Sequence, residues 1–144
     1  MRPTPITSFS GPHRYLSNFF ICRVEFGGLI FTSSEAVYQA AKCAEPELRG
    51  RFTSLSPSEA KRYGQKVKRR PDFEEKKLRI MYKILKAKFE QNEELRKKLE
   101  DTDPAELIEG NTWGDCFWGV CQGQGHNWLG KLLMELRTEF LIPF

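Results

Sequence analysis

SSEAVYQAAK, at residues 33–42, is the most informative stretch of the sequence. Serines precede a run of good helix formers, which is the pattern of a helix N-terminus. Positions seven apart on a helix differ in direction by only about 20°, so four polar side chains are expected along one stripe. They are Glu35, Tyr38, Gln39 and Lys42. The other side chains of this helix are small or apolar, so the stripe is predicted to be buried. Buried polar groups require partners or a function.

Two chemical roles compete for the ends of this stripe. A buried carboxylate has a raised pKa and can act as a general acid or base, which would suit Glu35. A buried lysine has a lowered pKa and can attack an aldehyde or oxocarbenium carbon, which would suit Lys42. A nearby amine, however, keeps a carboxylate ionised. The alternative is a purely structural pair, linked through Gln39.

Length and composition indicate one globular domain over residues 1–144. Hydrophobic residues make up 40% of the chain and charged residues 29%, which suits a folded rather than a disordered protein. The net charge of +4 and the pI of about 8.9 fit a nucleotide, phosphate or nucleic-acid partner, but they fit a protein without such a partner equally well.

The four cysteines, at positions 22, 43, 116 and 121, form no metal-binding motif. We therefore expect free, buried thiols and a cytoplasmic protein. No signal peptide and no apolar run long enough to cross a bilayer is visible. No motif requires a metal or a redox cofactor.

The hydrophobic pattern predicts a mainly α fold with a small N-terminal β-hairpin. The hairpin is expected over residues 20–31, turning at Gly27-Gly28. Residues 1–18 are expected to be irregular. Further helices are predicted at about 46–52, 57–64, 73–89, 92–99, 104–108 and 129–140. The helix at 57–64 should begin with a capping box formed by Ser56 and Glu59.

Three other segments carry candidate chemistry. WGDCFWG, at 113–119, combines stacking aromatics with Asp115, which could orient a hydroxyl, a water or Lys42; a tight aromatic core loop is the alternative. GQGHNWLGK, at 123–131, leads into a helix and could face a phosphate, although Asn127 could simply cap that helix. KRYGQKVKRR, at 61–70, is basic without any acid and could bind phosphates or form a solvated face.

Five ordered motifs together resemble the NADAR, or YbiA-like, family. They are LSNF at 16–19, TSSEAVYQAAK at 32–42, MYKILKAKFEQN at 81–92, DCFWG at 115–119 and GHNWLGKLLMELR at 125–137. The resemblance covers nearly the whole chain, from about residue 9 to 138. It implies an N-glycosidase, most notably one that removes ADP-ribose from guanine in nucleic acid. The alternatives are an N-glycosidase of phosphoribosylamino-pyrimidine riboflavin intermediates and a non-catalytic module that binds ADP-ribose or an NAD derivative.

The resemblance also implies roles for individual residues. Lys42 would be the nucleophile or Schiff-base lysine, Glu35 the acid/base group, and Asp115 a catalytic or orienting carboxylate. The expected substrate-binding residues are Asn18, Phe19, Tyr38, Gln39, Trp118, Gly119, Asn127, Leu129 and Gly130. No metal is implied, and a monomer acting on a nucleotide sugar or an ADP-ribosylated nucleic acid is expected. Gln65 stands where the family commonly has arginine, so its helix is expected to contribute little to phosphate binding.

Overall fold

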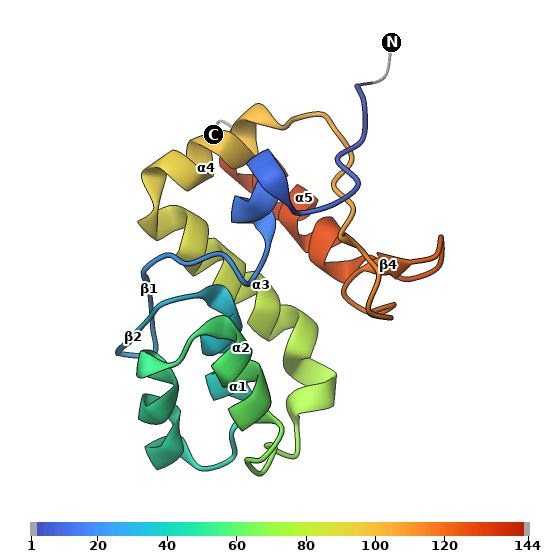
Figure 1. Ribbon diagram of the computed structural model, residues 1–144. Coiled ribbons are helices and arrows are strands. Elements are labelled where there is room, and N and C mark those ends of the chain that lie inside the picture. Colours follow the sequence, from blue (N-terminus) through green and yellow to red (C-terminus); the bar gives the residue numbers. More distant parts are fainter. Residues whose placement is uncertain (1–2, 143–144) are drawn as a thin grey trace. The chain divides into compact units, whose positions relative to one another are not determined.

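The computed structural model describes residues 3–142 and is mainly helical, with two small two-stranded sheets (Figure 1). This confirms the predicted fold class. The chain divides into two compact units. Unit 2 is Asn18–Glu93, and unit 1 comprises the segment that ends at Ser17 and the segment that begins at Glu94. That the whole chain is a single domain stays a prediction.

Unit 2 begins with the predicted hairpin. Strands β1 (Val24–Phe26) and β2 (Leu29–Phe31) pair antiparallel around the Gly27-Gly28 turn. The first strand is shorter than predicted, since it starts at Val24 rather than at residue 20. Helix α1 (Ser34–Lys42) follows at once, and Ser33 caps it by accepting a hydrogen bond from the backbone N–H of Ala36 at 3.1 Å.

The remaining helices of unit 2 follow the predicted order. They are η2 (Pro46–Ser54), a 3₁₀ helix, α2 (Pro57–Gly64) and α3 (Phe73–Gln91). The predicted capping box is present, because Ser56 Oγ accepts from the N–H of Glu59 at 3.2 Å and Glu59 Oε1 accepts from the N–H of Ser56 at 2.9 Å. Helix α1 packs against α2, α3 and η2, and α3 packs against β1 (Figure 1).

Unit 1 holds most of α4 (Glu93–Asp101) together with the C-terminal helix α5 (Trp128–Leu141). The strands β3 (Gly110–Asn111) and β4 (Val120–Cys121) pair in parallel. Within the N-terminal segment expected to be irregular, Gly11–Leu16 forms a 3₁₀ helix, η1. The core of this unit includes Leu99, Leu107, Leu133 and Leu136, each fully buried.

The prediction of a helix at 104–108 was wrong. Residues 104 and 105 belong to a turn, and residues 106–108 form a parallel bridge with the N-terminal segment. The N–H of Ile6 donates to Glu106 O at 2.9 Å, and the N–H of Ile108 donates to Ile6 O at 2.8 Å. Pairing with a distant segment satisfies these backbone groups. Five residues could not have done so as an isolated helix, because nucleation of such a short helix is unfavourable.

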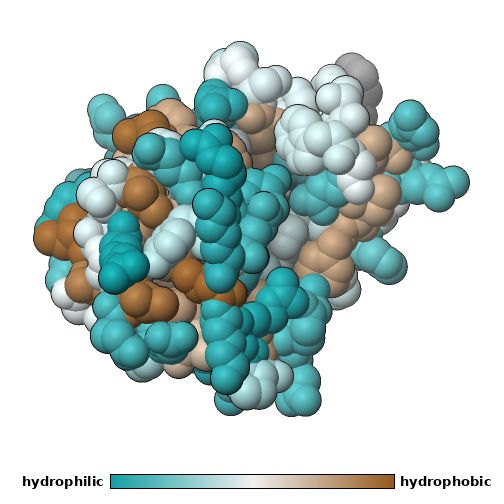
Figure 2. Space-filling model, turned by 60° about the horizontal axis from the view of Figure 1, so that its bottom comes forward, coloured by the Kyte–Doolittle hydropathy of each residue, from teal (hydrophilic) through white to brown (hydrophobic). Residues whose placement is uncertain are grey.

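The face drawn in Figure 2 is mostly hydrophilic, and hydrophobic residues lie on it in separate groups. Cys22, Cys43, Cys116 and Cys121 are all free thiols, as predicted. Only Cys43 is buried as predicted, whereas Cys22 and Cys121 are partly exposed and Cys116 is exposed. Among residues 3–142, no helix combines the length and the apolar character needed to traverse a bilayer.

Candidate active site

The polar stripe of α1 is buried in unit 2, as predicted. Glu35 and Tyr38 are each 8% exposed and Gln39 is 3% exposed, whereas Lys42, at the end of the helix, is half-buried. Ala36, Val37 and Ala40 of the same helix are buried in the core as well. A carboxylate, a phenol and an amide therefore lie within the protein interior, on the same stripe as an amine that reaches its edge.

Glu35 is held through its side chain by Gln39 and through its backbone by Asn18. Gln39 Nε2 donates a hydrogen bond to Glu35 Oε2 at 2.6 Å. The backbone N–H of Glu35 donates to Asn18 O at 3.0 Å, and Ser34 Oγ donates to Asn18 Oδ1 at 2.9 Å. Asn18 thus ties the preceding segment to the first turn of α1. The structure brings three predicted site residues together here, namely Asn18, Glu35 and Gln39.

Gln39 is fixed by packing as well as by this hydrogen bond. A Cβ at Gly64 would meet the side chain of Gln39, so only glycine fits at the end of α2. Gln39 Oε1 is buried without a hydrogen-bond partner among the described residues. The hydrogen bond at Nε2 and the packing of Oε1 against Gly64 together hold the Gln39 amide in one orientation, with its N–H toward Glu35.

Lys42 lies over an aromatic surface. Its Nζ is 5.6 Å from the centre of the Tyr38 ring, and the Tyr38 ring is 5.4 Å from the ring of Phe73. Lys61 Nζ lies 5.9 Å from the ring of Phe19, another predicted substrate-binding residue. Rings with cations over their faces suit a ligand that has both a flat base and negative charge.

The pKa of Lys42 is lowered from its ordinary value. Burial of the amine is the largest cause, and the Arg69 and Lys61 cations add to it. The carboxylates of Glu35 and Glu74 oppose the change without cancelling it. A larger fraction of this amine is therefore neutral near pH 7 than for a free lysine, and the neutral amine is the nucleophilic form.

The predicted site residues of unit 1 form a second cluster. Asp115 Oδ1 accepts hydrogen bonds from the backbone N–H groups of Phe117 at 3.1 Å and Trp118 at 2.9 Å. Asn111 brackets the same residue, since its Nδ2 donates to Asp115 O and its Oδ1 accepts from the N–H of Asp115. Asp115 therefore organises its own loop. A tight loop at this motif, as in the structural alternative, is part of the role of Asp115.

Trp118 and Gly119 connect this loop to the start of α5. The N–H of Leu129 donates to Trp118 O at 2.9 Å, and the N–H of Asn127 donates to Gly119 O at 3.2 Å. A Cβ at Gly119 would meet the side chains of Glu109 and Asn111 and the backbone of Glu109, so this position requires glycine.

Asn127 does not cap α5 through its side chain, although it occupies the cap position. Its backbone is left-handed, with φ of 53°, and its side chain reaches the 107–109 segment instead. Nδ2 donates to Leu107 O and Oδ1 accepts from the N–H of Glu109, both at 2.9 Å. A Cβ at Gly130 would meet Leu107 O and the Asn127 side chain. The backbone of Leu107 and the side chain of Asn127 therefore fill the space beside Gly130.

Lys88 is a buried ionisable residue for which no role was predicted. Lys88, on α3, is fully buried, and burial lowers its pKa to about 8. Its Nζ lies 5.2 Å from the ring of Phe89 and 5.9 Å from that of Phe20. The signal was present in the sequence, because Lys88 continues the buried stripe of Met81, Ile84 and Leu85 at helical spacing.

Proteins of known class and family resemble this chain in sequence and in structure. The N-glycosidase YbiA of Escherichia coli is 38% identical over 99% of this chain and 92% of its own length. Its NMR structure matches with a TM-score of 0.86, covering 97% of this chain and 86% of that one. A riboflavin biosynthesis protein of Vibrio vulnificus is 33% identical over 88% of this chain and 35% of its own length. The protein is an N-glycosyl hydrolase. It belongs to the NADAR family, whose domain matches residues 7–141.

Proposed function

We propose that this N-glycosidase removes ADP-ribose from guanine in nucleic acid. The observation that carries the proposal is the position of the basic segment 61–70 beside Lys42. Six of its ten residues are cationic and none is acidic, and its last residue donates a backbone hydrogen bond to Lys42 O at 2.8 Å. A polyanionic substrate would meet this charge at the reactive amine.

The proposed reaction uses Lys42 and Glu35. Neutral Lys42 attacks the anomeric carbon while the bond from that carbon to the base nitrogen breaks. Glu35 gives its proton to the departing base. Gln39 Nε2 donates to Oε2 and holds the carboxyl in place. Glu35 then takes a proton from the attached nitrogen and passes it to the ring oxygen, so that the ribose ring opens and leaves an iminium on Lys42. Water hydrolyses this iminium, a proton from the water returns to Glu35, and the sugar and the free amine are released.

The other predicted site residues enter this proposal with lesser roles. Asp115 would orient the substrate or a water, and its loop bonds mean that its replacement would disturb Trp118 as well. The proposed substrate contacts are Asn18, Phe19, Tyr38, Gln39, Trp118, Gly119, Asn127, Leu129 and Gly130. The predicted monomeric state and cytoplasmic location stay predictions.

A second candidate substrate is a phosphoribosylamino-pyrimidine. It is favoured by the names of two relatives, the riboflavin biosynthesis proteins of Vibrio vulnificus and Arabidopsis thaliana. The Arabidopsis protein is 41% identical over 62% of this chain, which matches 16% of that protein. Both candidates contain a ribose 5-phosphate unit bonded to nitrogen at its anomeric carbon, so the same two residues would serve either reaction.

Base release from the two substrates tests the proposal. The protein is incubated with DNA bearing ADP-ribosylated guanosine and, separately, with the phosphoribosylamino-pyrimidine. We expect a higher kcat/KM with the DNA; a higher value with the pyrimidine would establish the second candidate instead, and release from neither would overturn both. Borohydride added during turnover should trap a covalent adduct on Lys42, whereas active turnover without trapping would favour direct attack by water.

A further inference from the structure

We infer that Lys61 and Arg69 form a phosphate subsite beside Lys42 and bind the phosphate carried by the substrate's ribose. The inference rests on the proposed function, whose two candidate substrates share that phosphate. It selects two residues from a basic run that the sequence alone left between phosphate binding and a solvated face.

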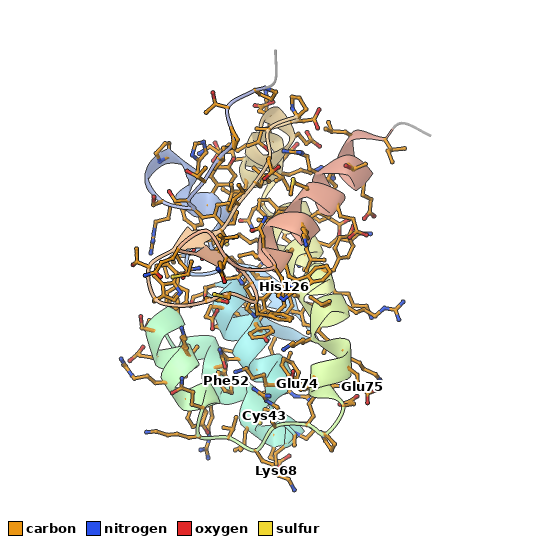
Figure 3. The ribbon with its side chains drawn as sticks, turned by 90° about the vertical axis from the view of Figure 1, so that its right-hand side faces the viewer. Cys43, Phe52, Lys68, Glu74, Glu75 and His126 are labelled. Atoms are coloured by element: carbon orange, nitrogen blue, oxygen red, sulfur yellow. The ribbon has the colours of Figure 1, made fainter. Side chains whose placement is uncertain are left out.

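Backbone pairing brings Arg69 to the end of α1. The segment 68–70 runs antiparallel to residues 42–44, with a bridge between Cys43 and Arg69. The N–H of Ala44 donates to Lys68 O, and the N–H of Arg70 donates to Lys42 O, both at 2.8 Å. Figure 3 shows Cys43 above Lys68, with Glu74 on the first turn of α3. Arg69 is therefore held next to the reactive lysine.

Aromatic rings lie beneath these cations. The guanidinium carbon of Arg69 is 5.5 Å from the centre of the Phe73 ring, which itself contacts the ring of Tyr38. Tyr38 lies in turn below Lys42. Phe73 and Tyr38 are 1% and 8% exposed, so these buried rings support the two cations from below and leave their outer sides to an anion.

The charges within the basic run are not equivalent. Arg70 is occupied, because its guanidinium makes two hydrogen bonds to Asp72, at 2.8 and 2.9 Å. Arg69 makes one, from Nη1 to Glu74 Oε1 at 2.5 Å, and its side chain is 51% exposed. Lys61 makes no ion pair among the described residues. Arg69 and Lys61 therefore have donors to offer an anion.

Both cations act on the site already described. Lys61 lies on α2, which packs against α1, and Arg69 pairs with the end of α1. From these positions each cation lowers the pKa of Lys42. Lys61 is four positions before Gln65, on the helix that was expected to contribute little to phosphate binding. The contribution of α2 comes from this earlier turn and does not depend on Gln65.

The test compares two substrates that differ only in the phosphate. One is the ribosylated base with its 5′-phosphate, and the other carries a 5′-hydroxyl. Lys61→Ala and Arg69→Ala should each lower kcat/KM for the phosphorylated substrate about 10-fold or more, mainly by raising KM, since charge-assisted hydrogen bonds contribute at this level. The value for the 5′-hydroxyl substrate should fall only by the smaller factor that the change in the pKa of Lys42 causes, so the preference for the phosphorylated substrate falls in each variant. Lys83→Ala removes an exposed lysine from α3 and should change neither value.

One result would overturn the subsite, namely an unchanged preference for the phosphorylated substrate in both variants, whether or not the two kcat/KM values fall. Arg69→Gln provides a second variant that keeps a polar side chain of similar length. If the wild type releases base from neither substrate, the proposed function has failed, and titration calorimetry with ribose 5-phosphate tests the subsite separately. Binding that is weaker in Arg69→Gln but not in Lys83→Ala would support it, and equal binding would overturn it.

Discussion

At the scale of single residues, Lys42 is controlled by charges from three neighbouring elements. Arg69 lowers its pKa from the segment before α3, Lys61 does so from α2, and Glu74 raises it from the first turn of α3. Glu35, on the same helix, also raises it. These effects have opposite signs, so single substitutions should move the activity of the enzyme along the pH axis in opposite directions.

The limb of the pH profile of kcat/KM that follows the pKa of Lys42 in the free enzyme should report these charges. Lys42 must be neutral to attack, so its pKa is one of those that set the profile. Arg69→Ala removes a cation, raises the pKa of Lys42, and should move the limb to higher pH. Glu74→Gln removes an anion and should move it to lower pH. Shifts in the same direction, or no shift in either variant, would contradict this assignment.

Removal of the two reactive groups should abolish turnover without unfolding the protein. Lys42→Ala should leave no detectable base release, because no other amine occupies its position on α1. Glu35→Gln keeps the volume of the side chain but cannot supply a proton, and we expect kcat to fall about 10²- to 10⁴-fold. Lys83→Ala is the matched control. Thermal melts should confirm folding, and substantial activity in the folded Lys42→Ala variant would exclude the imine mechanism.

At the scale of elements, the local signals were reliable. The capping box at α2 depends on residues three positions apart, and it could be predicted because both partners are present in one short stretch. Ser56→Ala should lower the free energy of unfolding by about 1 kcal/mol, measured by urea denaturation. Ser58→Ala makes the same chemical change on the exposed second position of that helix and should have a smaller effect; equal effects would mean that the cap contributes nothing.

Partners distant in sequence could not be predicted. The extended backbone at 106–108 depends on Ile6, a hundred residues earlier. The side chain of Asn127 makes hydrogen bonds to the 107–109 segment rather than to its own helix. The proximity of Arg69 to Lys42 likewise depends on strand-like pairing between two loops. The residue types of the site could be predicted from its motifs. The groups that make hydrogen bonds to those residues, or shift their pKa values, come from elsewhere in the chain.

Lys88 should make the stability of the protein depend on pH. Its pKa of about 8 when folded lies below its ordinary value of 10.5, so between these pH values the unfolded chain binds more protons. The free energy of unfolding should therefore rise with pH across this window, by roughly 3 kcal/mol in total. Lys88→Met removes this contribution.

The measurement is the difference in unfolding free energy between the two proteins at several pH values. Both should carry Cys22→Ala, because burial raises the pKa of Cys22 and the Lys88 charge opposes that rise. As the pH rises above 8, the free energy of unfolding of the protein that keeps Lys88 should increase relative to that of the Lys88→Met variant. A difference that does not change with pH would show that Lys88 is already neutral, or fully charged, across the whole range.

At the scale of the whole molecule, the path of the chain links the two units. Unit 1 is made of two segments, and all of unit 2 is inserted between Ser17 and Glu94. Pairing of Ile6 with the 106–108 segment therefore closes a loop that contains unit 2. If residues 18–93 were unfolded, closing that loop would cost about 4 kcal/mol of chain entropy, plus a constant. Within unit 2, Asn92 Nδ2 donates to Arg23 O at 3.0 Å, so a folded unit 2 holds its two ends near each other and lowers this cost.

The two units should therefore unfold together. All three tryptophans, at positions 113, 118 and 128, belong to unit 1, so tryptophan fluorescence follows that unit alone. Leu85→Ala removes a fully buried side chain from unit 2 and should destabilise that unit by about 2–5 kcal/mol. Because unit 1 depends on unit 2 for loop closure, the fluorescence transition in urea should shift to lower concentration, together with the far-UV circular dichroism. Leu133→Ala, which makes the same kind of cavity in unit 1, sets the scale of the shift. If Leu85→Ala changed the circular dichroism transition but left the fluorescence transition in place, the units would fold independently and the prediction of a single domain would be wrong.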